Sequence, residues 1–378
     1  MRNKAVMITG ARAPVALHWA WAFRRAGRSV FLADSLRWPI GQGAGFSQGY
    51  LRHASPRQDL ARFRRDLLDQ CAAKGIGVIV PTCEEVFWLA QIAPDLKAAG
   101  VRLHAPPFAL LAQVHDKGAF IDLCRGFWPH LPRTLRLQSR ADMGSAGDPG
   151  GLVFKPAYSR FALRTLIRPT AQALSRICPS PGDPWVAQQF VSGREICAFA
   201  VARQGQVTAL AAYHPLYRAG KGAGIFFQPV DPAPALAFVR AFARATGWSG
   251  QLSFDLIETD TGLVPIECNP RATSGLHLLR DPVALVQALE GDAPGLVAQD
   301  GTPQAVHLAM WLYAAWANRS RWAAFQADLA RADEALVWDG RPVTALRQGL
   351  AVAEIAARAL WRRQGLQAAA THDIEWNG

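Results

Sequence analysis

Residues 254–271 read FDLIETDTGLVPIECNPR and carry the most informative pattern of the chain. Their first part is an apolar, strand-like run that contains Asp255. The turn residues TDTG at 259–262 predict a hairpin, and the second strand, LVPI, leads directly to Glu267 and Asn269. Folding this hairpin brings Asp255 close to Glu267 and Asn269 at one end of the strand pair.

The three side chains at this strand end offer hard oxygen ligands. Two carboxylates and an amide oxygen suit Mg²⁺, which binds through one or two carboxylates and completes its shell with phosphate oxygens. Arg271 follows two residues after Asn269 and can reach a phosphate or a carboxylate through its planar fork. An ordinary exposed hairpin with charged residues at its end is the alternative explanation.

A second hairpin pattern lies at residues 185–202. The apolar run WVAQQFV leads into the turn residues SGR at 192–194, and a second strand begins at Glu195. Taken alone, these residues favour a β-hairpin of the core with a polar residue at its edge over a binding role.

Two lysines stand at the ends of predicted elements. Lys155 lies in the short apolar strand VFKP, and Lys117 follows Asp116 before a helical stretch at 118–124. A lysine at the end of a buried strand is costly unless it meets an anion, so Lys155 is the stronger candidate for an anion contact. Lys117 also fits a solvated surface cation.

The amino-terminal region predicts a β-α-β unit, with a strand at 4–10, a helix at 11–26 and a strand at 29–34. Residues 75–81 predict a later strand of the same sheet, and the TCEE that follows fits a helix cap. Only Gly10 of a G-x-G-x-x-G pattern is present, so a dinucleotide site is not expected.

These four patterns together resemble the ATP-grasp superfamily, over about residues 4–290. In that family an acidic residue, followed about a dozen positions later by E-x-N or E-x-N-x-R, holds magnesium ions on ATP. Asp255, Glu267 and Asn269 match the metal ligands, with Mn²⁺ as the alternative metal, and Arg271 matches the arginine. The branches that look most similar are those of carbamoyl-phosphate synthases and peptide ligases.

The resemblance also implies the ATP-binding residues. The linker between the two lobes would supply the adenine slot and then the ribose contact: Gln188, Gln189, Phe190, Val191 and Glu195. Gln188 stands where many relatives carry Glu, which leaves its role open. Lys117 and Lys155 would touch the phosphates.

The implied fold is α/β and α+β. The chain would begin with a doubly wound parallel sheet, as in the domain that precedes the ATP-grasp domain of such proteins. A two-lobed ATP-grasp domain and a mainly helical carboxy-terminal segment would follow. The expected ranges are 1–105 for the Rossmann-like domain, 106–184 for the first lobe, 185–295 for the second lobe with the metal-binding hairpin, and 296–378 for the extension.

Several further contacts follow from the resemblance. Relatives carry a glycine-rich loop after the second lysine, whereas residues 157–164 contain no glycine; Ser159, Arg160 and Arg164 are the substitutes. Loops after the strands of the first domain face the second substrate in relatives, which makes Thr82, Glu84 and Glu85 candidates beside their capping role. A glycine-rich stretch in the second lobe adds candidates for substrate or γ-phosphate contact: His214, Arg218 and Lys221. A loop at 39–49 is expected beside the substrate region.

Composition and charge limit the class of protein. The 378 residues are half apolar, so a folded chain is expected, and the six cysteines lack metal spacing and fit reduced thiols of a cytoplasmic protein. The net charge is +12. Residues 1–65 hold 12 basic and 2 acidic residues, or +10. This basic excess fits solvated helix faces, or attraction to an acidic substrate, a carrier protein or an anionic membrane. Nucleic acid is not expected, because basic and aromatic residues are not interleaved.

The carboxy-terminal extension is rich in aromatic residues. Residues 309–316 are strongly aromatic, and residues 343–364 predict an amphipathic helix that ends in WRR. Core packing explains both, and a hydrophobic substrate channel or a membrane-surface helix is the alternative. No role is predicted for the last residues, 373–378.

The resemblance implies a ligase that activates a carboxylate as an acyl phosphate with ATP and joins it to an amine, giving an amide, ADP and phosphate. Lys155 and Arg271 would be the catalytic residues. A carboxylase or carbamoyl-phosphate-type kinase that acts on bicarbonate, and a regulatory nucleotide-binding module without turnover, remain open. Small-molecule substrates are the expected partners, and a homodimer is compatible with the family.

Overall fold

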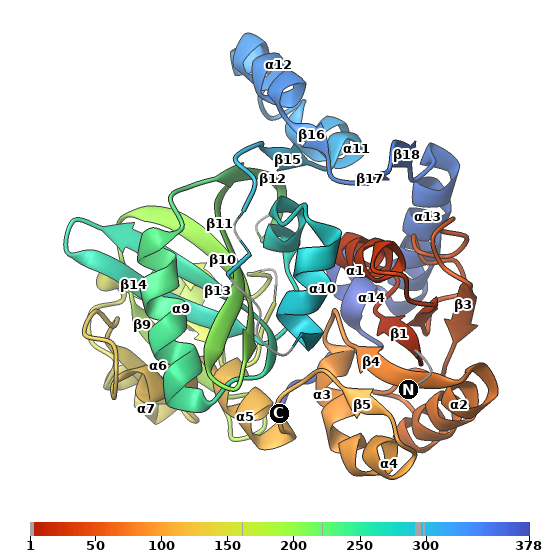
Figure 1. Cartoon of the computed structure of the whole chain (residues 1–378). Helices are drawn as coiled ribbons and strands as arrows, with labels where there is room; N and C mark the ends of the chain where they lie inside the picture. Colours follow the sequence, from red (N-terminus) through yellow and green to blue (C-terminus); the bar gives the residue numbers. More distant parts are fainter. Residues whose placement is uncertain (1–3, 161, 221, 292–295, 298) are drawn as a thin grey trace.

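The structure is a computed structural model that describes residues 4–160, 162–220, 222–291, 296–297 and 299–378. Figure 1 shows a parallel sheet at the amino-terminal end, two lobes built on antiparallel sheets, and a helical carboxy-terminal part. This architecture confirms the predicted fold class.

The amino-terminal domain is a five-stranded parallel sheet in the order β3-β2-β1-β4-β5. Its elements are β1 (Ala5–Thr9), α1 (Pro14–Arg25), β2 (Val30–Asp34), β3 (Gly49–Arg52), α2 (Leu60–Lys74), β4 (Ile76–Val80), α3 (Glu85–Gln91), α4 (Ala93–Ala98) and β5 (Arg102–Leu103). Apolar residues of α1 pack on one face of the sheet and those of α2 on the other, so its central strands are buried on both sides. The predicted β-α-β unit is confirmed.

The small lobe is a four-stranded antiparallel sheet in the order β6-β9-β7-β8. It comprises β6 (Thr134–Leu137), α7 (Arg140–Gly144), β7 (Leu152–Pro156), β8 (Leu166–Ile167), α8 (Ala171–Leu174) and β9 (Trp185–Gln189). Trp185 and Phe154 fill its core. Because β9 pairs with both β6 and β7, this sheet continues past residue 184, where the sequence placed the start of the second lobe.

The large lobe is a seven-stranded sheet in the order β14-β13-β10-β11-β12-β15-β16. Its strands are β10 (Arg194–Arg203), β11 (Gln206–Ala219), β12 (Ala223–Pro229), β13 (Gly250–Thr259), β14 (Gly262–Asn269), β15 (Gln304–Ala305) and β16 (Asp333–Glu334). Helices α5 (Phe108–His115), α6 (Lys117–Cys124) and α9 (Ala233–Thr246) share an aromatic core with one face, where Phe120, Phe238 and Phe254 meet.

The other face of the large sheet packs on α10 (Pro282–Glu290) and on α1 of the amino-terminal domain. Trp19 of α1 donates a hydrogen bond through Nε1 to Gln251 Oε1 of β13 at 2.5 Å. The amino-terminal domain and the large lobe therefore share one continuous core, which fixes the ends of their strands relative to one another.

The carboxy-terminal part contains α11 (His307–Ala309), a π-helical turn (Met310–Ala314), α12 (Trp322–Arg331), β17 (Val337–Trp338), β18 (Arg341–Pro342), α13 (Ala345–Arg362) and α14 (Leu366–Thr371). Figure 1 shows α12 projecting from the body and α13 lying beside α1. The amphipathic helix predicted at 343–364 is confirmed as α13. Of the predicted aromatic stretch, Trp316 is 77% exposed, so core packing does not explain that residue.

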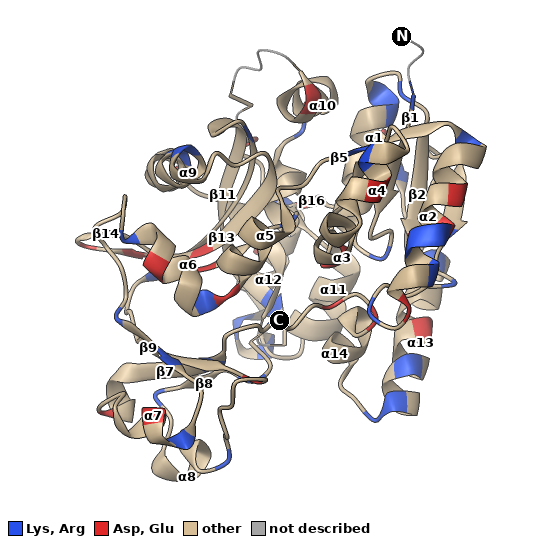
Figure 2. Cartoon of the chain, turned by 90° about the horizontal axis from the view of Figure 1, so that it is seen from below, with Lys and Arg blue, Asp and Glu red and all other residues tan. Residues whose placement is uncertain are grey.

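Charge and hydropathy are distributed unevenly. Figure 2 shows Lys and Arg along α1, α2 and α13. Among the described residues, no helix combines the length and the apolar character needed to cross a membrane. The six cysteines are free thiols, as the sequence predicted.

Candidate active site

The hairpin predicted at residues 254–271 is confirmed as β13–β14. Thr259 pairs with Gly262 across a two-residue turn, and the register places Asp255 opposite Glu267 and Ser253 opposite Asn269. Because side chains alternate along a strand, Phe254 and Cys268 enter the core behind the hairpin, while Asp255 and Glu267 share the opposite face. Local sequence periodicity thus places both predicted carboxylates on one surface.

Both predicted lysines approach this carboxylate pair. Lys117 lies 3.3 Å from Glu267 Oε2 through Nζ, and Lys155 donates to Ile266 O at 3.4 Å. The two lysines are only 3% and 4% exposed. The alternative that Lys117 is a solvated surface cation is therefore wrong. Asp116 begins α6 by accepting hydrogen bonds from the amides of Gly118 and Ala119, which sets the direction of the adjoining Lys117.

Burial and charge shift the pKa values at this site in different directions. Burial and the adjacent Glu267 raise the pKa of Asp255. Burial alone would raise the pKa of Glu267, but Lys117 and Lys155 lower it below the usual range. Burial lowers the pKa of Lys155 to about 8, with Lys117 acting in the same direction. The two lysines thus do not fully stabilise the negative charge of this site. Asp255 is the carboxylate whose charge is stabilised least.

The donor set fits a divalent cation. Asp255 and Glu267 lie opposite each other on one face of the hairpin, where their negative charges repel each other. Asn269 follows two residues along β14, and its Nδ2 lies 3.5 Å from Glu267 Oε1. Within the described ranges, no group of three or more His, Cys, Asp or Glu side chains is suited to hold a metal. Two carboxylates are nonetheless the number that Mg²⁺ uses when phosphate oxygens complete its shell.

A pocket of about 290 Å³ opens beside these charges, between β7 and β9 of the small lobe and β10 and β13 of the large lobe. Its lining includes most of the predicted nucleotide residues: Lys155, Gln188, Gln189, Phe190, Val191, Glu195, Asp255 and Glu267. A larger pocket of about 770 Å³ lies elsewhere and contains none of these residues. The candidate active site is therefore assigned from its chemistry and not from its size.

The linker residues differ in how they are held. Gln188 is buried and donates through Nε2 to Thr134 Oγ1 at 3.2 Å. Its side-chain amide is therefore used in a contact within the small lobe. The amides of Gln189 and Phe190 donate to Arg133 O and Gly151 O, each at 2.8 Å. The Val191 amide has no backbone acceptor among the described residues. Of the amides at 189–191, it is therefore the one not engaged with another strand or loop of the described residues.

Glu195, the predicted ribose contact, lies at the pocket with Arg218. Arg218 Nη2 is 2.5 Å from Glu195 Oε1, and His214 Nδ1 is 2.8 Å from the Glu195 carbonyl oxygen. Arg218 also lines the pocket, so this candidate is brought to the site. Arg218 stands on strand β11. Lys221 lies outside the described residues.

Arg271 connects the hairpin to the amino-terminal domain. Its Nη2 donates to Asn269 Oδ1 at 3.4 Å, and its Nε lies 3.8 Å from Glu84 Oε1. Glu84 is also paired with Arg160. Burial alone would raise the pKa of Glu84, but Arg160 and Arg271 help to lower it. Glu84 therefore belongs to this charged cluster, beyond the capping role that the sequence suggested.

The other residues of the TCEE segment serve the local fold. Glu85 Oε1 accepts hydrogen bonds from Thr9 Oγ1 at 2.6 Å and from the Thr82 amide at 3.0 Å. Thr82 Oγ1 donates to Thr9 O at 2.6 Å and does not cap α3. The predicted cap is wrong, because the threonine hydroxyl is used to join β1 and β4 at their ends.

The loop after Lys155 is held by the end of the chain. Arg160 Nη2 donates to Trp376 O at 2.7 Å, and Arg160 Nη1 meets Glu375 Oε2 at 3.1 Å and Asn377 Oδ1 at 2.9 Å. Arg164, in contrast, pairs with Asp183 at 2.6 Å, and its guanidinium lies over Trp185. Arg164 is therefore not brought to the 290 Å³ pocket, because its charge is paired with Asp183 within the small lobe.

The last residues form a strap between the amino-terminal domain and the small lobe. Trp376 stacks on Phe87 with ring centroids 5.1 Å apart and meets Tyr158 edge to face. Asp373 accepts from Arg12 Nη1 at 2.6 Å, and Arg12 is also paired with Asp34 at 2.5 Å. Sequence reasoning assigned these residues no role, and the only available signal was the unusual number of acidic and aromatic residues at a chain end.

No protein-family model matches the chain, and no curated protein sequence matches it. Solved structures do. N5-carboxyaminoimidazole ribonucleotide synthetase from Thermus thermophilus has a TM-score of 0.60 at 17% identity and covers 78% of this chain and 80% of its own. L-amino acid ligase from Bacillus licheniformis has a TM-score of 0.59 at 14% identity, and the match covers 76% of this chain and 74% of the ligase chain. A biotin carboxylase–β,γ-ATP complex from Campylobacter jejuni has a TM-score of 0.58 at 13% identity, and the match covers 77% of this chain and 72% of the carboxylase chain.

These neighbours are ATP-grasp ligases, and the chain has the ATP-grasp fold. At 13–17% identity the likeness concerns the fold, and it agrees with the predicted arrangement of a parallel sheet followed by two lobes.

Proposed function

We propose that this protein is an ATP-dependent ligase that joins a small carboxylic acid to an amine, with ADP and phosphate as the other products. The observation that carries the proposal is the meeting of Asp255 and Glu267 with two buried lysines at the edge of the linker pocket. Buried lysines and unequally titrating carboxylates are expected where phosphate and metal charges are to be bound.

The chain's own residues would position ATP. The Val191 amide would donate to adenine, and Glu195, which is paired with Arg218, would hold the ribose hydroxyl groups. Lys117 and Lys155 would accept the phosphates. Asp255, Glu267 and Asn269 would hold Mg²⁺, which when bound neutralises charge on the phosphoryl group during transfer.

The reaction requires two transfers. A carboxylate oxygen attacks the γ-phosphorus, and ADP leaves as the acyl phosphate forms. The amine then attacks the acyl carbon, phosphate leaves, and the amine loses a proton. Arg271 would stabilise the tetrahedral oxyanion or the leaving phosphate, because its guanidinium lies between the metal-binding hairpin and Glu84. Exclusion of water protects the acyl phosphate, and the loop anchored through Arg160 serves that purpose.

The name L-amino acid ligase of one structural neighbour favours a carboxylate and an amine as substrates. A second candidate function is a carboxylase that acts on bicarbonate, which is favoured by the likeness to a biotin carboxylase. Both reactions begin with phosphorylation of an acid by ATP, so the same carboxylates and lysines serve either one.

The test is ADP release from Mg-ATP over a panel of carboxylic acids, with hydroxylamine as the substitute amine. A hydroxamate formed with one acid establishes acyl-phosphate chemistry and identifies that acid. ADP release that requires bicarbonate and yields no hydroxamate would favour the carboxylase. ATP binding without ADP release across the panel and with bicarbonate would contradict both and favour a regulatory nucleotide-binding module.

A further inference from the structure

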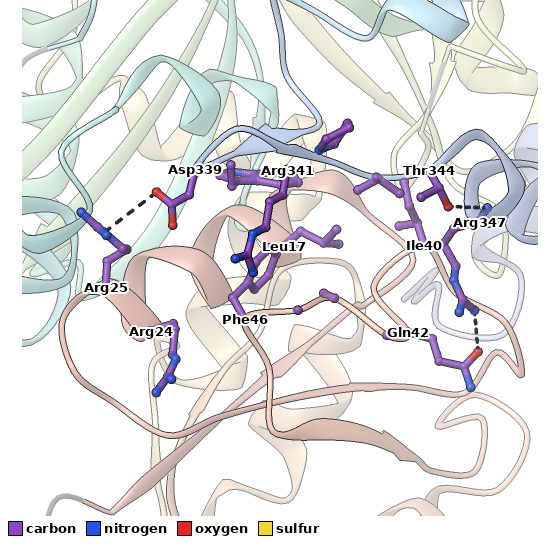
Figure 3. A pocket seen from close by; sticks show the side chains of 16 residues that line it. Leu17, Arg24, Arg25, Ile40, Gln42, Phe46, Asp339, Arg341, Thr344 and Arg347 are labelled. Carbon is purple, nitrogen blue, oxygen red and sulfur yellow. Dashed lines mark hydrogen bonds and ion pairs between the residues drawn. The ribbon is translucent and has the colours of Figure 1, made fainter.

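A second pocket, which is rich in arginine, lies between the amino-terminal domain and the carboxy-terminal part. It has a volume of about 770 Å³ and is lined by α1, by the loop at 40–46 and by the segment at 338–347 (Figure 3). None of its lining residues lines the 290 Å³ nucleotide pocket. The loop that the sequence placed beside the substrate region therefore borders a different pocket.

Four arginines surround this pocket from both sides. Figure 3 shows Arg24 and Arg25 at one end, Arg347 at the other and Arg341 between them. Arg24 and Arg25 come from the last turn of α1, whereas Arg341 and Arg347 lie more than 300 residues later in the chain. The cluster exists only when the carboxy-terminal part is docked on the amino-terminal domain.

The positive charge in this pocket is poorly compensated. The acidic residue in the lining is Asp339, which lies 4.0 Å from Arg25. Within the described part of the chain, Arg24, Arg341 and Arg347 have no carboxylate within 4.0 Å. Arg347 Nη1 donates to the neutral Gln42 Oε1 at 3.2 Å. The buried Arg12, in contrast, is neutralised by two aspartates.

The backbone and the apolar floor give the pocket a defined shape. Gly43 has a φ of +79°, and a Cβ at this position would lie 3.1 Å from Arg347 Nη2, so glycine allows the guanidinium to approach the loop. Trp338 is buried and donates through Nε1 to His18 Nδ1 at 3.3 Å, while Phe46 packs against it with centroids 5.8 Å apart. The hydrogen bond and the ring packing therefore hold the side chains of this floor in place.

From the four arginines and this floor we infer that the pocket binds a small molecule that carries phosphate groups, at a site separate from the ligase reaction. Arginine guanidinium groups bind phosphate oxygens through paired, charge-assisted hydrogen bonds, and three guanidinium groups here lack an acidic partner among the residues that the structure describes. The volume suits a ligand of nucleotide or sugar-phosphate size. A bound phosphate would join α1 to Arg341 of β18 and Arg347 of α13 and so strengthen their contact.

The first measurement is calorimetric titration of the full-length protein with pyrophosphate at physiological ionic strength without Mg²⁺. We expect one saturable site, weakened at least about tenfold in Arg341→Ala and in Arg347→Ala. Lys155→Ala should leave it intact, which separates it from the nucleotide pocket. Arg65→Ala is the matched control, because Arg65 is an exposed arginine of α2 outside the pocket.

Three results would overturn the inference. One is the absence of saturable binding. Another is binding that Lys155→Ala removes and Arg341→Ala does not. The third is equal weakening by Arg65→Ala, which would indicate attraction to the general basic surface. Citrate is the parallel probe: if citrate binds with the same dependence on Arg341 and Arg347 while pyrophosphate does not bind, the pocket accepts carboxylates and the phosphate assignment is wrong.

Discussion

The 290 Å³ pocket and the 770 Å³ pocket differ in how their charged side chains are paired. In the nucleotide pocket each buried lysine faces Glu267, and Arg218 is paired with Glu195. In the arginine pocket a single carboxylate, Asp339, accompanies four guanidinium groups near solvent. Buried charges need partners in the folded state itself, whereas exposed arginines tolerate their absence. Removing a charged side chain should therefore strongly reduce activity or ligand binding in the nucleotide pocket. In the arginine pocket it should leave the free energy of unfolding almost unchanged.

The largest effect is expected for Glu267→Gln. This change keeps the shape of the side chain, removes a metal-binding charge and leaves Lys117 and Lys155 less compensated. We expect acid-dependent ADP release to fall about 10²–10³-fold, together with loss of Mg²⁺-dependent binding of a non-hydrolysable ATP analogue. Glu258→Gln on the same hairpin is the control, since Glu258 pairs with Arg194 outside the pocket. Normal turnover in Glu267→Gln would refute the metal assignment.

The next effect concerns the strap. Asp373→Asn leaves the buried Arg12 with only one aspartate, which should lower the free energy of unfolding by about 3 kcal/mol at pH 7. Burial alone would raise the pKa of Asp373, but Arg12 holds it below the usual range of an aspartate. This carboxylate therefore stabilises the fold fully above about pH 4 and loses that effect as the pH falls further. Urea unfolding at pH 7 and pH 3 should show the difference shrinking in acid.

The control for the strap is Asp260→Asn at the exposed turn of the hairpin, which should change stability by less than about 0.5 kcal/mol. An Asp373→Asn protein as stable as this control at pH 7 would mean that the strap contributes little to the fold.

A smaller effect is expected at Lys155. Lys155→Met should weaken ATP binding about 10–100-fold by removing a charged phosphate contact, and Lys74→Met on the exposed end of α2 should not. Because burial lowers the pKa of Lys155 to about 8, ATP affinity of the wild type should decline as the pH rises from 7 to 9 and the lysine loses its proton. Titrations at three pH values check this, and equal decline in Lys155→Met would contradict it.

The smallest effect is expected in the arginine pocket, where it also has the opposite sign. Arg341→Ala removes an exposed positive charge that has no acidic partner in the described part of the chain, so the free energy of unfolding should stay equal or rise by up to about 0.5 kcal/mol. High salt should remove the difference by screening. A clear loss of stability would show that Arg341 is structurally paired and would weaken the contrast between the pockets.

The strap and the β13–β14 hairpin differ in how far the sequence could predict them. The hairpin depends on the turn at 259–262 and on the alternation of side chains, both of which act over a few residues. The strap contact between Arg160 and Trp376 joins residues 216 positions apart. No local pattern reports such a contact, which explains why Arg160 was expected at a phosphate and the end of the chain had no predicted role.

The sequence by itself determined the parallel sheet, the hairpin with Asp255 opposite Glu267, the two lysines at strand and helix ends, and the amphipathic helix α13. Each of these follows from periodicity, turn residues or the cost of burying an unpaired charge. Only the tertiary structure decided that Glu84 joins Arg160 and Arg271, that Arg164 turns outward, and that four arginines enclose a second pocket. Those arrangements depend on the docking of elements far apart in the chain, where packing of the shared core determines which charges meet.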